Sequence, residues 1–294
     1  DRADYHEDER YTGFYAQDEI HLFNDMVRLT LAGRYTAARY SDTIRASKVT
    51  PRIGVSVSID KQTSVYALYD QAFVPQAGRI YPNKAAKPLL GENIEVGVKK
   101  DWFQGRWNST ISAYRILRSN QLVTDPDAHG EEGLNYSLQL GKSETKGIEA
   151  DIHGEIVHGL NLTINYAYTD SKITEDLDPK KVGEAVPGFA KHVTNGWLSY
   201  RLEKGALKGF GIAAGYQYQV DRSSWSWAAV NQLELPDYFR MDGAVSWQNN
   251  KYSVAVNVNN LLNKYLYSGT PYDTYYYWQA EPGINFRAAV GVKF

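Results

Sequence analysis

Apolar and polar residues alternate with a period of two along most of this chain. In the segment 252–259, Tyr252, Val254, Val256 and Val258 fall on one face, and smaller or polar residues fall on the other. The same alternation recurs in the segments 94–99, 162–168 and 210–220. A period of two is typical of a β-strand, whereas an amphipathic helix repeats every 3.6 residues. The pattern therefore predicts an all-β fold, because no helical periodicity is long enough to compete.

The predicted strands are long, at about 10–16 residues, whereas strands of soluble proteins usually have about 5–6. Their polar faces carry mostly Gly, Ala, Ser, Asn and Gln rather than Lys and Glu. Aromatic residues gather near strand ends, namely Trp107, Tyr166, Tyr168, Tyr216, Tyr218 and Trp247. The alternative, a soluble β-sandwich, explains none of these features. They favour a transmembrane antiparallel β-barrel with an apolar face in lipid and aromatic residues at the membrane interfaces.

Short and long connections are predicted to alternate along the chain. The short ones are 23–25, 60–62, 104–106, 157–159, 203–209 and 249–251. The long ones are about 39–49, 73–92, 119–134, 171–190, 221–236 and 267–282. Tight periplasmic turns and longer extracellular loops are typical of outer-membrane barrels. This reading makes 135–157 one long strand that rises well above the membrane.

The pattern predicts about thirteen strands, of which the first and last both run toward the periplasm. Bacterial barrels have even strand numbers, so we expect further strands before Asp1. The last strand ends at Phe294, where closure onto the first strand would satisfy its backbone groups. We expect Phe286, Val290, Val292 and Phe294 to face lipid, like the valine face of 252–259. Asn257, Asn259, Arg287, Gly291 and Lys293 are expected to face the lumen.

Composition removes several classes of function. The formal net charge of −2 gives no electrostatic reason to expect a nucleic acid partner. The chain has no cysteine, which excludes disulfides and thiolate metal sites. It has no run of 18 apolar residues, as a transmembrane helix would need.

Five segments, in order, resemble the TonB-dependent outer-membrane receptors, and among them the ferric-siderophore receptors. They are "YTGFYAQDEIHLFNDMVRLTLAGRY" (11–35), "SVYALYDQAFVPQAG" with "LLGENIEVGVKKDWFQGRWNSTISAYRILRSN" (64–120), "GKSETKGIEADIHGEIVHGLNLTINYAYTDSKI" (141–173), "VNNLLNKYLY" (258–267) and "INFRAAVGVKF" (284–294). The resemblance runs along the whole chain. One departure is Glu281-Pro282-Gly283 in place of the common Gly-Glu-Pro-Arg, which leaves the substrate subclass open.

The resemblance implies a 22-stranded barrel in the bacterial outer membrane, with residues 1–294 as the C-terminal portion, the last thirteen strands. The plug domain, the TonB box and about nine strands would belong to a missing N-terminal part. The implied function is TonB-energised uptake of ferric siderophores, with no cofactor and no enzymatic activity. The implied partners are the TonB complex, reached through the missing part, and outer-membrane lipid and lipopolysaccharide. Alternatives are an importer of cobalamin, haem or oligosaccharide, and a passive pore.

The predicted outer loops combine aromatic and cationic residues, which suit a bulky, flat-faced and often anionic ferric siderophore. The expected substrate-binding residues are Arg79, Tyr81, Trp225, Trp227, Tyr272, Tyr275, Tyr276, Tyr277 and Trp278. The alternative is that these rings pack loop against loop or form the upper aromatic girdle.

No metal or catalytic site is expected. The segment 124–133 gathers Asp125, Asp127, His129, Glu131 and Glu132, but its spacing fits no EF-hand, and it is interpreted as a solvated acidic loop. The six histidines form no i, i+4 pair. Asp151 and His153 share a strand face but have no nucleophile motif beside them.

Overall fold

The computed structural model describes residues 9–40, 44–76, 79–82, 84–125, 136–186, 188–223, 235–272 and 275–293. Every regular element within these ranges is a β-strand, in agreement with the predicted all-β fold. In the same ranges no helix is long and apolar enough to cross a membrane.

Thirteen strands form one sheet, which confirms the predicted number. They are β1 (Glu9–Leu22), β2 (Val27–Tyr40), β3 (Ile44–Ser58), β4 (Thr63–Val74), β7 (Leu89–Trp102), β8 (Trp107–Thr124), β9 (Ser137–Val157), β10 (Leu160–Glu175), β11 (Ala190–Arg201), β12 (Phe210–Arg222), β13 (Tyr238–Gln248), β14 (Tyr252–Asn259) and β17 (Asn285–Val292). Each strand pairs with its neighbours in this order. Among the described residues, β1 and β17 are the two edge strands, so these strands do not close the sheet on themselves.

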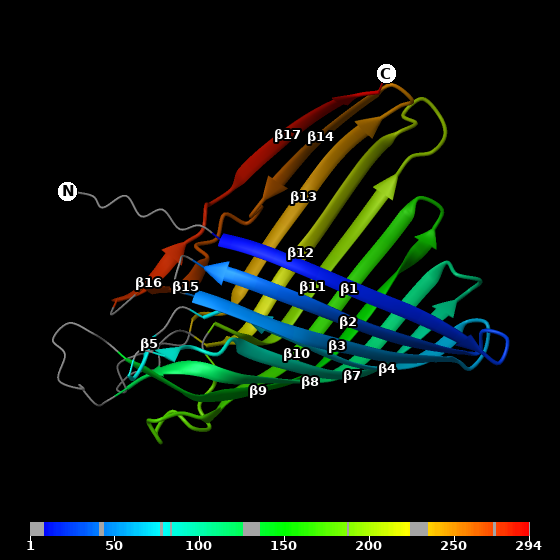
Figure 1. Ribbon diagram of the computed structural model, residues 1–294. Coiled ribbons are helices and arrows are strands. Elements are labelled where there is room, and N and C mark those ends of the chain that lie inside the picture. Colours follow the sequence, from blue (N-terminus) through cyan, green and yellow to red (C-terminus); the bar gives the residue numbers. More distant parts are fainter. Residues whose placement is uncertain are drawn as a thin grey trace. The chain divides into compact units, whose positions relative to one another are not determined.

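The chain divides into two compact units. The first comprises residues 1–98, 113–146 and 171–186, and the second comprises 99–112, 147–170 and 187–294. In the first unit β1 to β4 run side by side, and in the second β11 to β14 and β17 do so (Figure 1). Two small hairpins complete the strands: β5 (Arg79–Ile80) with β6 (Lys84–Ala85), and β15 (Tyr267–Tyr272) with β16 (Tyr275–Ala280).

The six predicted short connections are confirmed, because each separates two strands that are adjacent in the sheet. At the turn between β1 and β2, Phe23, Asn24 and Asp25 have φ angles of 53°, 54° and 66°. Gly209 has a φ of 89°, and a Cβ there would lie 1.8 Å from the carbonyl oxygen of Gln248. Only glycine therefore fits at this position of the turn between β11 and β12, where the backbone passes close to the last residue of β13.

The long connection predicted at 39–49 is wrong. The ladder between β2 and β3 continues to the pair Tyr40 and Ile44, which leaves only 41–43 between the strands. The pairing continues through Arg39 with Arg45 to the last pair because the cross-strand ladder supplies hydrogen bonds that a loop would lack. The single long strand predicted to end at Val157 is confirmed as β9, which has 21 residues.

One face of the sheet carries exposed apolar side chains. On β7 the exposed fractions of Ile94, Val96 and Val98 are 53%, 51% and 43%. On β14 Tyr252, Val254 and Val256 are exposed, as predicted, while Val258, opposite Phe286, is half-buried. Asn257 and Asn259 are half-buried, and the Asn259 amide donates to Asn285 Oδ1 at 2.9 Å. Contiguous exposed apolar surface of this kind marks contact with lipid or another apolar partner.

Most buried apolar side chains lie near the long connections. Among the described residues they are Ala38, Ala86, Tyr136, Leu235, Tyr238 and Leu266. The core is therefore not a layer between two sheets. Of the six, Ala38 lies within β2, and the other five lie in or directly beside the long connections.

Candidate ligand-binding site

Five of the predicted binding residues belong to the β15–β16 hairpin: Tyr272, Tyr275, Tyr276, Tyr277 and Trp278. The hairpin is antiparallel, with Tyr272 opposite Tyr275 and Gly269 opposite Trp278. It extends from the end of β14 that lies away from the C-terminal end of the chain (Figure 1). The backbone thus brings these five residues together in one two-stranded element. Their side chains lie outside the described part of the structure.

The base of this hairpin is closed by buried contacts. The Glu281 N–H donates to the Leu266 carbonyl oxygen at 2.9 Å, which joins the two ends of the hairpin. Glu281 Oε2 in turn accepts a hydrogen bond of 2.8 Å from the hydroxyl of Tyr238. Tyr238 is only 3% exposed and Leu266 only 5%. The Glu281 carboxylate is therefore held in position by Tyr238, the first residue of β13.

Arg240 extends this contact along β13. Its Nη1 donates to the Tyr238 hydroxyl at 3.2 Å and lies 3.8 Å from Glu281 Oε2. Its Nε and Nη2 atoms lie 3.1 Å and 3.0 Å from Asp242 Oδ2. One guanidinium thus sits between two carboxylates, which balances their charge and fixes the ring of Tyr238.

Arg222, the last residue of β12, holds the first residue of the hairpin, Tyr267. Its Nη1 donates to the carbonyl oxygens of Tyr267 at 2.9 Å and Pro236 at 3.2 Å. Its guanidinium carbon lies 5.2 Å from the centre of the Tyr238 ring, within cation–π range. Arg222, Tyr238, Arg240, Asp242 and Glu281 together are called the hairpin anchor below.

Asn260 shapes the turn that leads into the hairpin. This side chain is 1% exposed, and the residue has a φ of 53°, which asparagine tolerates better than most residues. Its amide donates to the carbonyl oxygens of Lys264 at 2.8 Å and Pro282 at 3.3 Å. Its backbone N–H donates to Asp242 Oδ1 at 2.9 Å, which links the turn to the hairpin anchor.

A second predicted binding residue, Tyr81, lies in the turn between β5 and β6. Its ring is 47% exposed and contacts the ring of Tyr136 edge to face, with 5.5 Å between the centroids. Tyr136 is only 6% exposed, so the Tyr81 ring packs against a buried ring on one side and is accessible to solvent on the other. For Arg79 the structure describes the backbone, in β5, and not the side chain.

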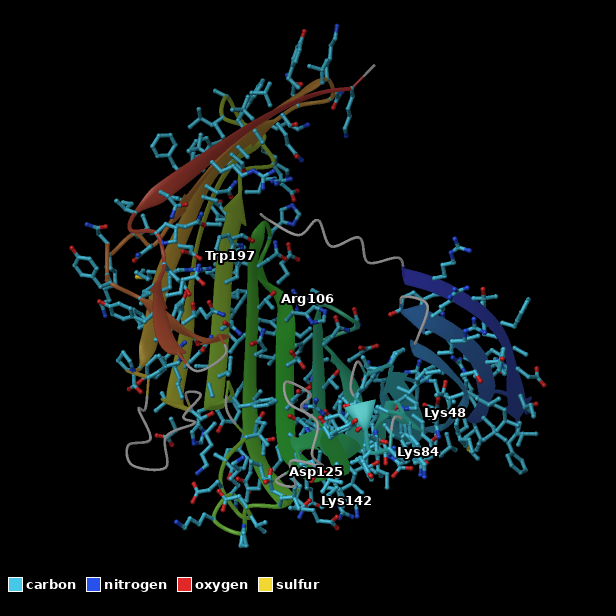
Figure 2. The ribbon with its side chains drawn as sticks, turned by 60° about the vertical axis from the view of Figure 1, so that its left-hand side comes forward. Lys48, Lys84, Arg106, Asp125, Lys142 and Trp197 are labelled. Carbon is cyan, nitrogen blue, oxygen red and sulfur yellow. The ribbon has the colours of Figure 1, made fainter. Side chains whose placement is uncertain are left out.

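Three amides hold the segment that follows β6. Gln76 Nε2 donates to the carbonyl oxygens of Lys87 at 3.0 Å and Asn120 at 2.7 Å. Gln139 Oε1 accepts from the Lys87 N–H at 2.8 Å, and Asn120 Nδ2 donates to the Pro88 carbonyl at 3.1 Å. In this unit Lys84, Asp125 and Lys142 all lie at the same end of the strands (Figure 2).

Trp225 and Trp227 lie in 224–234, which is outside the described residues. The same holds for the range 126–135, which contains Asp127, His129, Glu131 and Glu132 of the acidic segment. Within the part of the chain that is described, no group of three or more His, Asp or Glu residues could hold a metal ion.

The anchoring residues were not predicted from the sequence. Glu281 stood out only as a departure from a family pattern, and Asn260 only as part of the segment 258–267. Arg222 precedes the tryptophan-rich segment directly, and a cation at the end of a predicted strand is the one signal that could have drawn attention to it.

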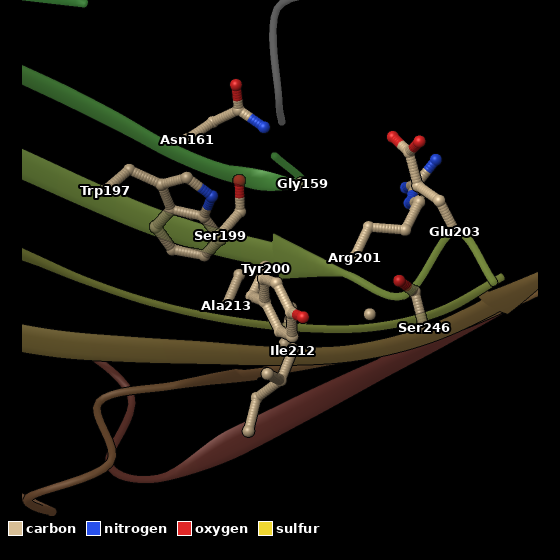
Figure 3. Close-up of a pocket in the computed structure, with 12 residues that line it drawn as sticks. Gly159, Asn161, Trp197, Ser199, Tyr200, Arg201, Glu203, Ile212, Ala213 and Ser246 are labelled. Atoms are coloured by element: carbon tan, nitrogen blue, oxygen red, sulfur yellow. The ribbon is translucent and has the colours of Figure 1, made fainter. Parts of the chain in front are cut away.

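A cavity of about 430 Å³ lies in the second unit, near the short turns and thus at the strand ends opposite to the hairpin anchor. Trp197, Asn161 and Ser199 line one side of the sheet there, while Ile212 points away from it (Figure 3). A Cβ on Gly215 would lie 2.2 Å from the Trp197 ring, so the absence of a side chain at Gly215 leaves room for the indole. The lining combines small residues, such as Gly211 and Ala213, with the charged residues Arg201 and Glu203.

Comparison with known proteins identifies the fold. The family model described as TonB dependent receptor-like, beta-barrel matches residues 1–261. The ferripyoverdine receptor of the outer membrane of Pseudomonas aeruginosa, solved with ferripyoverdine bound, has a TM-score of 0.78 at 24% identity, over 97% of this chain and 38% of that one. This likeness confirms the predicted transmembrane β-barrel class.

Two curated relatives are similar in sequence. The ferric-pyoverdine M114 receptor PbuA of Pseudomonas sp. (strain M114) is 31% identical over 250 residues, which is 84% of this chain and 30% of the relative. The ferrioxamine B receptor of Salmonella typhimurium (strain LT2) is 27% identical over 289 residues, which is 94% of this chain and 40% of the relative. The chain thus spans 30–40% of the length of these relatives.

The matched family model covers most of the chain, and the strand number, the turn rhythm and the exposed apolar face agree with it. Its barrels are proteins of the bacterial outer membrane. This chain belongs to the TonB-dependent receptor-like β-barrel family.

Proposed function

We propose that residues 1–294 are the C-terminal portion of the barrel of an outer-membrane receptor for TonB-energised uptake of ferric siderophores. The observation that carries this proposal is the β15–β16 hairpin, which combines five aromatic residues with a buried polar anchor at its base. Relatives named as receptors for ferric pyoverdine and ferrioxamine B support the same class of ligand.

The anchor suits the capture of a bulky ligand. A flexible loop would lose conformational entropy on binding, whereas a hairpin held at its base has already lost much of it. Aromatic side chains add contact area at a small further entropy cost. We propose that Tyr81, Trp225, Trp227, Tyr272, Tyr275, Tyr276, Tyr277 and Trp278 contact the ligand, and that Arg79 attracts its negative charge.

The energy for uptake would come from a TonB complex that acts through a plug domain outside these residues. In this proposal the polar face of the sheet, including the cavity beside Trp197, faces the barrel interior. The apolar face, with Ile94 and Val96, faces membrane lipid.

Equilibrium binding of a siderophore panel to the full-length receptor tests the proposal. We expect tight binding of at least one ferric siderophore, and we expect Trp278→Ala to weaken it about thirtyfold, or about 2 kcal/mol. Tyr265→Ala is the matched control, because Tyr265 is 87% exposed but precedes the hairpin. Its affinity should stay within twofold of the parent.

Two outcomes would contradict the proposal. Tight binding of cobalamin, haem or an oligosaccharide, without any iron chelate, would change the class of ligand and leave a receptor. Unspecific solute flux through the receptor in liposomes, without any tight ligand, would indicate a passive pore.

A further inference from the structure

The cavity beside Trp197 is a slot in the polar face of the second unit (Figure 3). Along β11 two long side chains flank a short one, and each of the three is opposite a glycine or an alanine of β12. The pairs are Trp197 with Gly215, Ser199 with Ala213, and Arg201 with Gly211. The two long side chains start roughly 13 Å apart along the strand. The cavity between them is called the Trp197 slot below.

Short side chains form the floor of the Trp197 slot. In the register Asn161 of β10 is opposite Ser199, and Ala213 is opposite Ala244 of β13. Because these side chains are short, the space between Trp197 and Arg201 stays open, with a volume of about 430 Å³. Cavities of about 300–1,000 Å³ are typical of small-ligand sites. The Asn161 amide and the Ser199 hydroxyl supply hydrogen-bonding groups to the lining.

Trp197 offers a flat aromatic surface on the polar face. A Cβ on Gly215 would lie 2.2 Å from Trp197 Cε3 and 3.0 Å from Cζ3, so the six-membered ring of the indole covers Gly215. The residue is nevertheless 39% exposed. An exposed indole in a defined place gives a planar ring a surface to stack on, at a small entropy cost.

Polar groups form the end of the slot near the short turns. Ser246 Oγ lies 2.8 Å, and Arg201 Nε 3.8 Å, from the position that a Cβ on Gly211 would take. Glu203 also lines this end, and its Oε2 lies 2.6 Å from His158 Nε2. Arg201 and Ser246 thus supply N–H and O–H donors. Because a carboxylate and a guanidinium share this end, it suits an uncharged ring with oxygen acceptors better than a strongly anionic one.

The Trp197 slot lies on the same face of β13 as the hairpin anchor. Arg240 and Asp242 of the anchor and Ala244 of the slot floor are alternate residues of this strand, so they share one face. The row that contains Arg240 continues across the neighbouring strands with amide side chains, namely Gln217, Asn195 and Asn165. A ligand that leaves the hairpin along this face therefore meets hydrogen-bonding groups first and the Trp197 ring next.

We propose that the Trp197 slot is an inner binding site for a planar, oxygen-bearing ring of the imported iron chelate, after its release from the aromatic hairpin. The ring would stack on Trp197, and its oxygen atoms would accept hydrogen bonds from Ser199 and Arg201. This inference rests on the proposed function, which supplies the ligand. It adds a site near the short turns to the one proposed at the outer loops.

Protection of an introduced cysteine tests the slot in the detergent-solubilised full-length receptor. Residues 1–294 contain no cysteine, so Ser246→Cys places the one thiol of this segment in the lining of the slot. Its alkylation by a small maleimide is followed on the peptide that contains position 246. The probe is iron(III) tris(benzohydroxamate), an uncharged chelate with phenyl rings and iron-bound oxygens. At about ten times its Kd the probe should slow alkylation about tenfold, because about a tenth of the sites remain free.

Matched variants separate stacking from other effects. Trp197→Ala should weaken probe binding about tenfold, so protection at the same concentration should fall to about twofold. Trp197→Phe keeps a ring and should keep most of the protection. Trp247→Ala is the control, because Trp247 is also 39% exposed but stands on the opposite face of β13 from Ser246. This control should be protected like the parent.

A matched chelate tests the ring itself. Iron(III) tris(acetohydroxamate) has the same charge and the same iron-bound oxygens but no ring, so it should give no protection. This comparison carries the test alone if Trp197→Ala fails to fold. Equal protection by the two chelates, or full protection in Trp197→Ala, would overturn the proposal. Slow alkylation without any probe would also overturn it, because another segment of the receptor, such as the plug, would then fill the slot.

The siderophore panel separates this inference from the proposed function. Trp197-dependent protection in a receptor that binds no ferric siderophore would sink the proposed function and leave a ring-binding slot. Tight siderophore binding without protection at position 246 would do the reverse.

Discussion

Tyr238 and Glu281, which are 43 residues apart in sequence, are joined by a hydrogen bond of 2.8 Å. This bond connects the first residue of β13 to the residue that follows β16, and it is shielded because Tyr238 is buried. The position of the aromatic hairpin therefore depends on a contact made at its base.

Tyr238→Phe should loosen the hairpin without unfolding the sheet. The change removes a hydrogen bond to a carboxylate, worth about 1.5–3 kcal/mol, and leaves that carboxylate with a weaker set of partners. We expect faster amide hydrogen exchange across 267–280 and about tenfold weaker ligand binding. Tyr252→Phe, at an exposed position of β14, should change neither. Unchanged exchange in Tyr238→Phe would show that the anchor does not hold the hairpin.

Gly215→Ala should destabilise the protein. The added Cβ would lie 2.2 Å from the Trp197 ring and 2.5 Å from the Gly196 carbonyl oxygen, so the indole must move. Overpacking of this kind costs about 1–3 kcal/mol, measurable by denaturant unfolding of the refolded receptor. Gly33→Ala is the control, since its Cβ would meet no atom within 4 Å. If both variants unfold alike, the indole does not occupy this place.

Val256→Lys should cost about 2–4 kcal/mol of folding free energy, because a charge would face the hydrocarbon near mid-membrane. Val256 is 38% exposed on the apolar face of β14. Asn257→Lys, on the opposite face, should cost much less. Assembly and thermal stability in outer-membrane vesicles measure both variants, and equal stability of the two would refute the assignment of faces.

Arg79→Ala should slow association with an anionic iron chelate more than it speeds dissociation. A charge that attracts the ligand, as proposed for Arg79, acts over several ångströms and steers encounter, so its effect should shrink as salt is raised. Stopped-flow binding at two salt concentrations measures this. Lys204→Ala, in the short connection between β11 and β12, is the control, and a salt-independent loss in Arg79→Ala would argue for a direct contact instead.

The strands, their number and their short turns could be predicted because alternation is a local property. A residue two positions along a strand returns to the same face whatever the rest of the chain does, so "YSVAVNVN" predicts β14 by itself. The apolar face and the position of β9 follow from the same rule. The connection at 39–49 could not be predicted in this way, because its residues pair with each other only once β2 and β3 are in register.

The hairpin anchor was decided by tertiary structure. Arg222 meets the Tyr267 carbonyl 45 residues away, and nothing near either residue indicates that they meet. The sequence by itself thus determined which residues form strands and which faces are apolar, since both depend on near neighbours. Strand register, a long-range property, decided which charges and rings share a site.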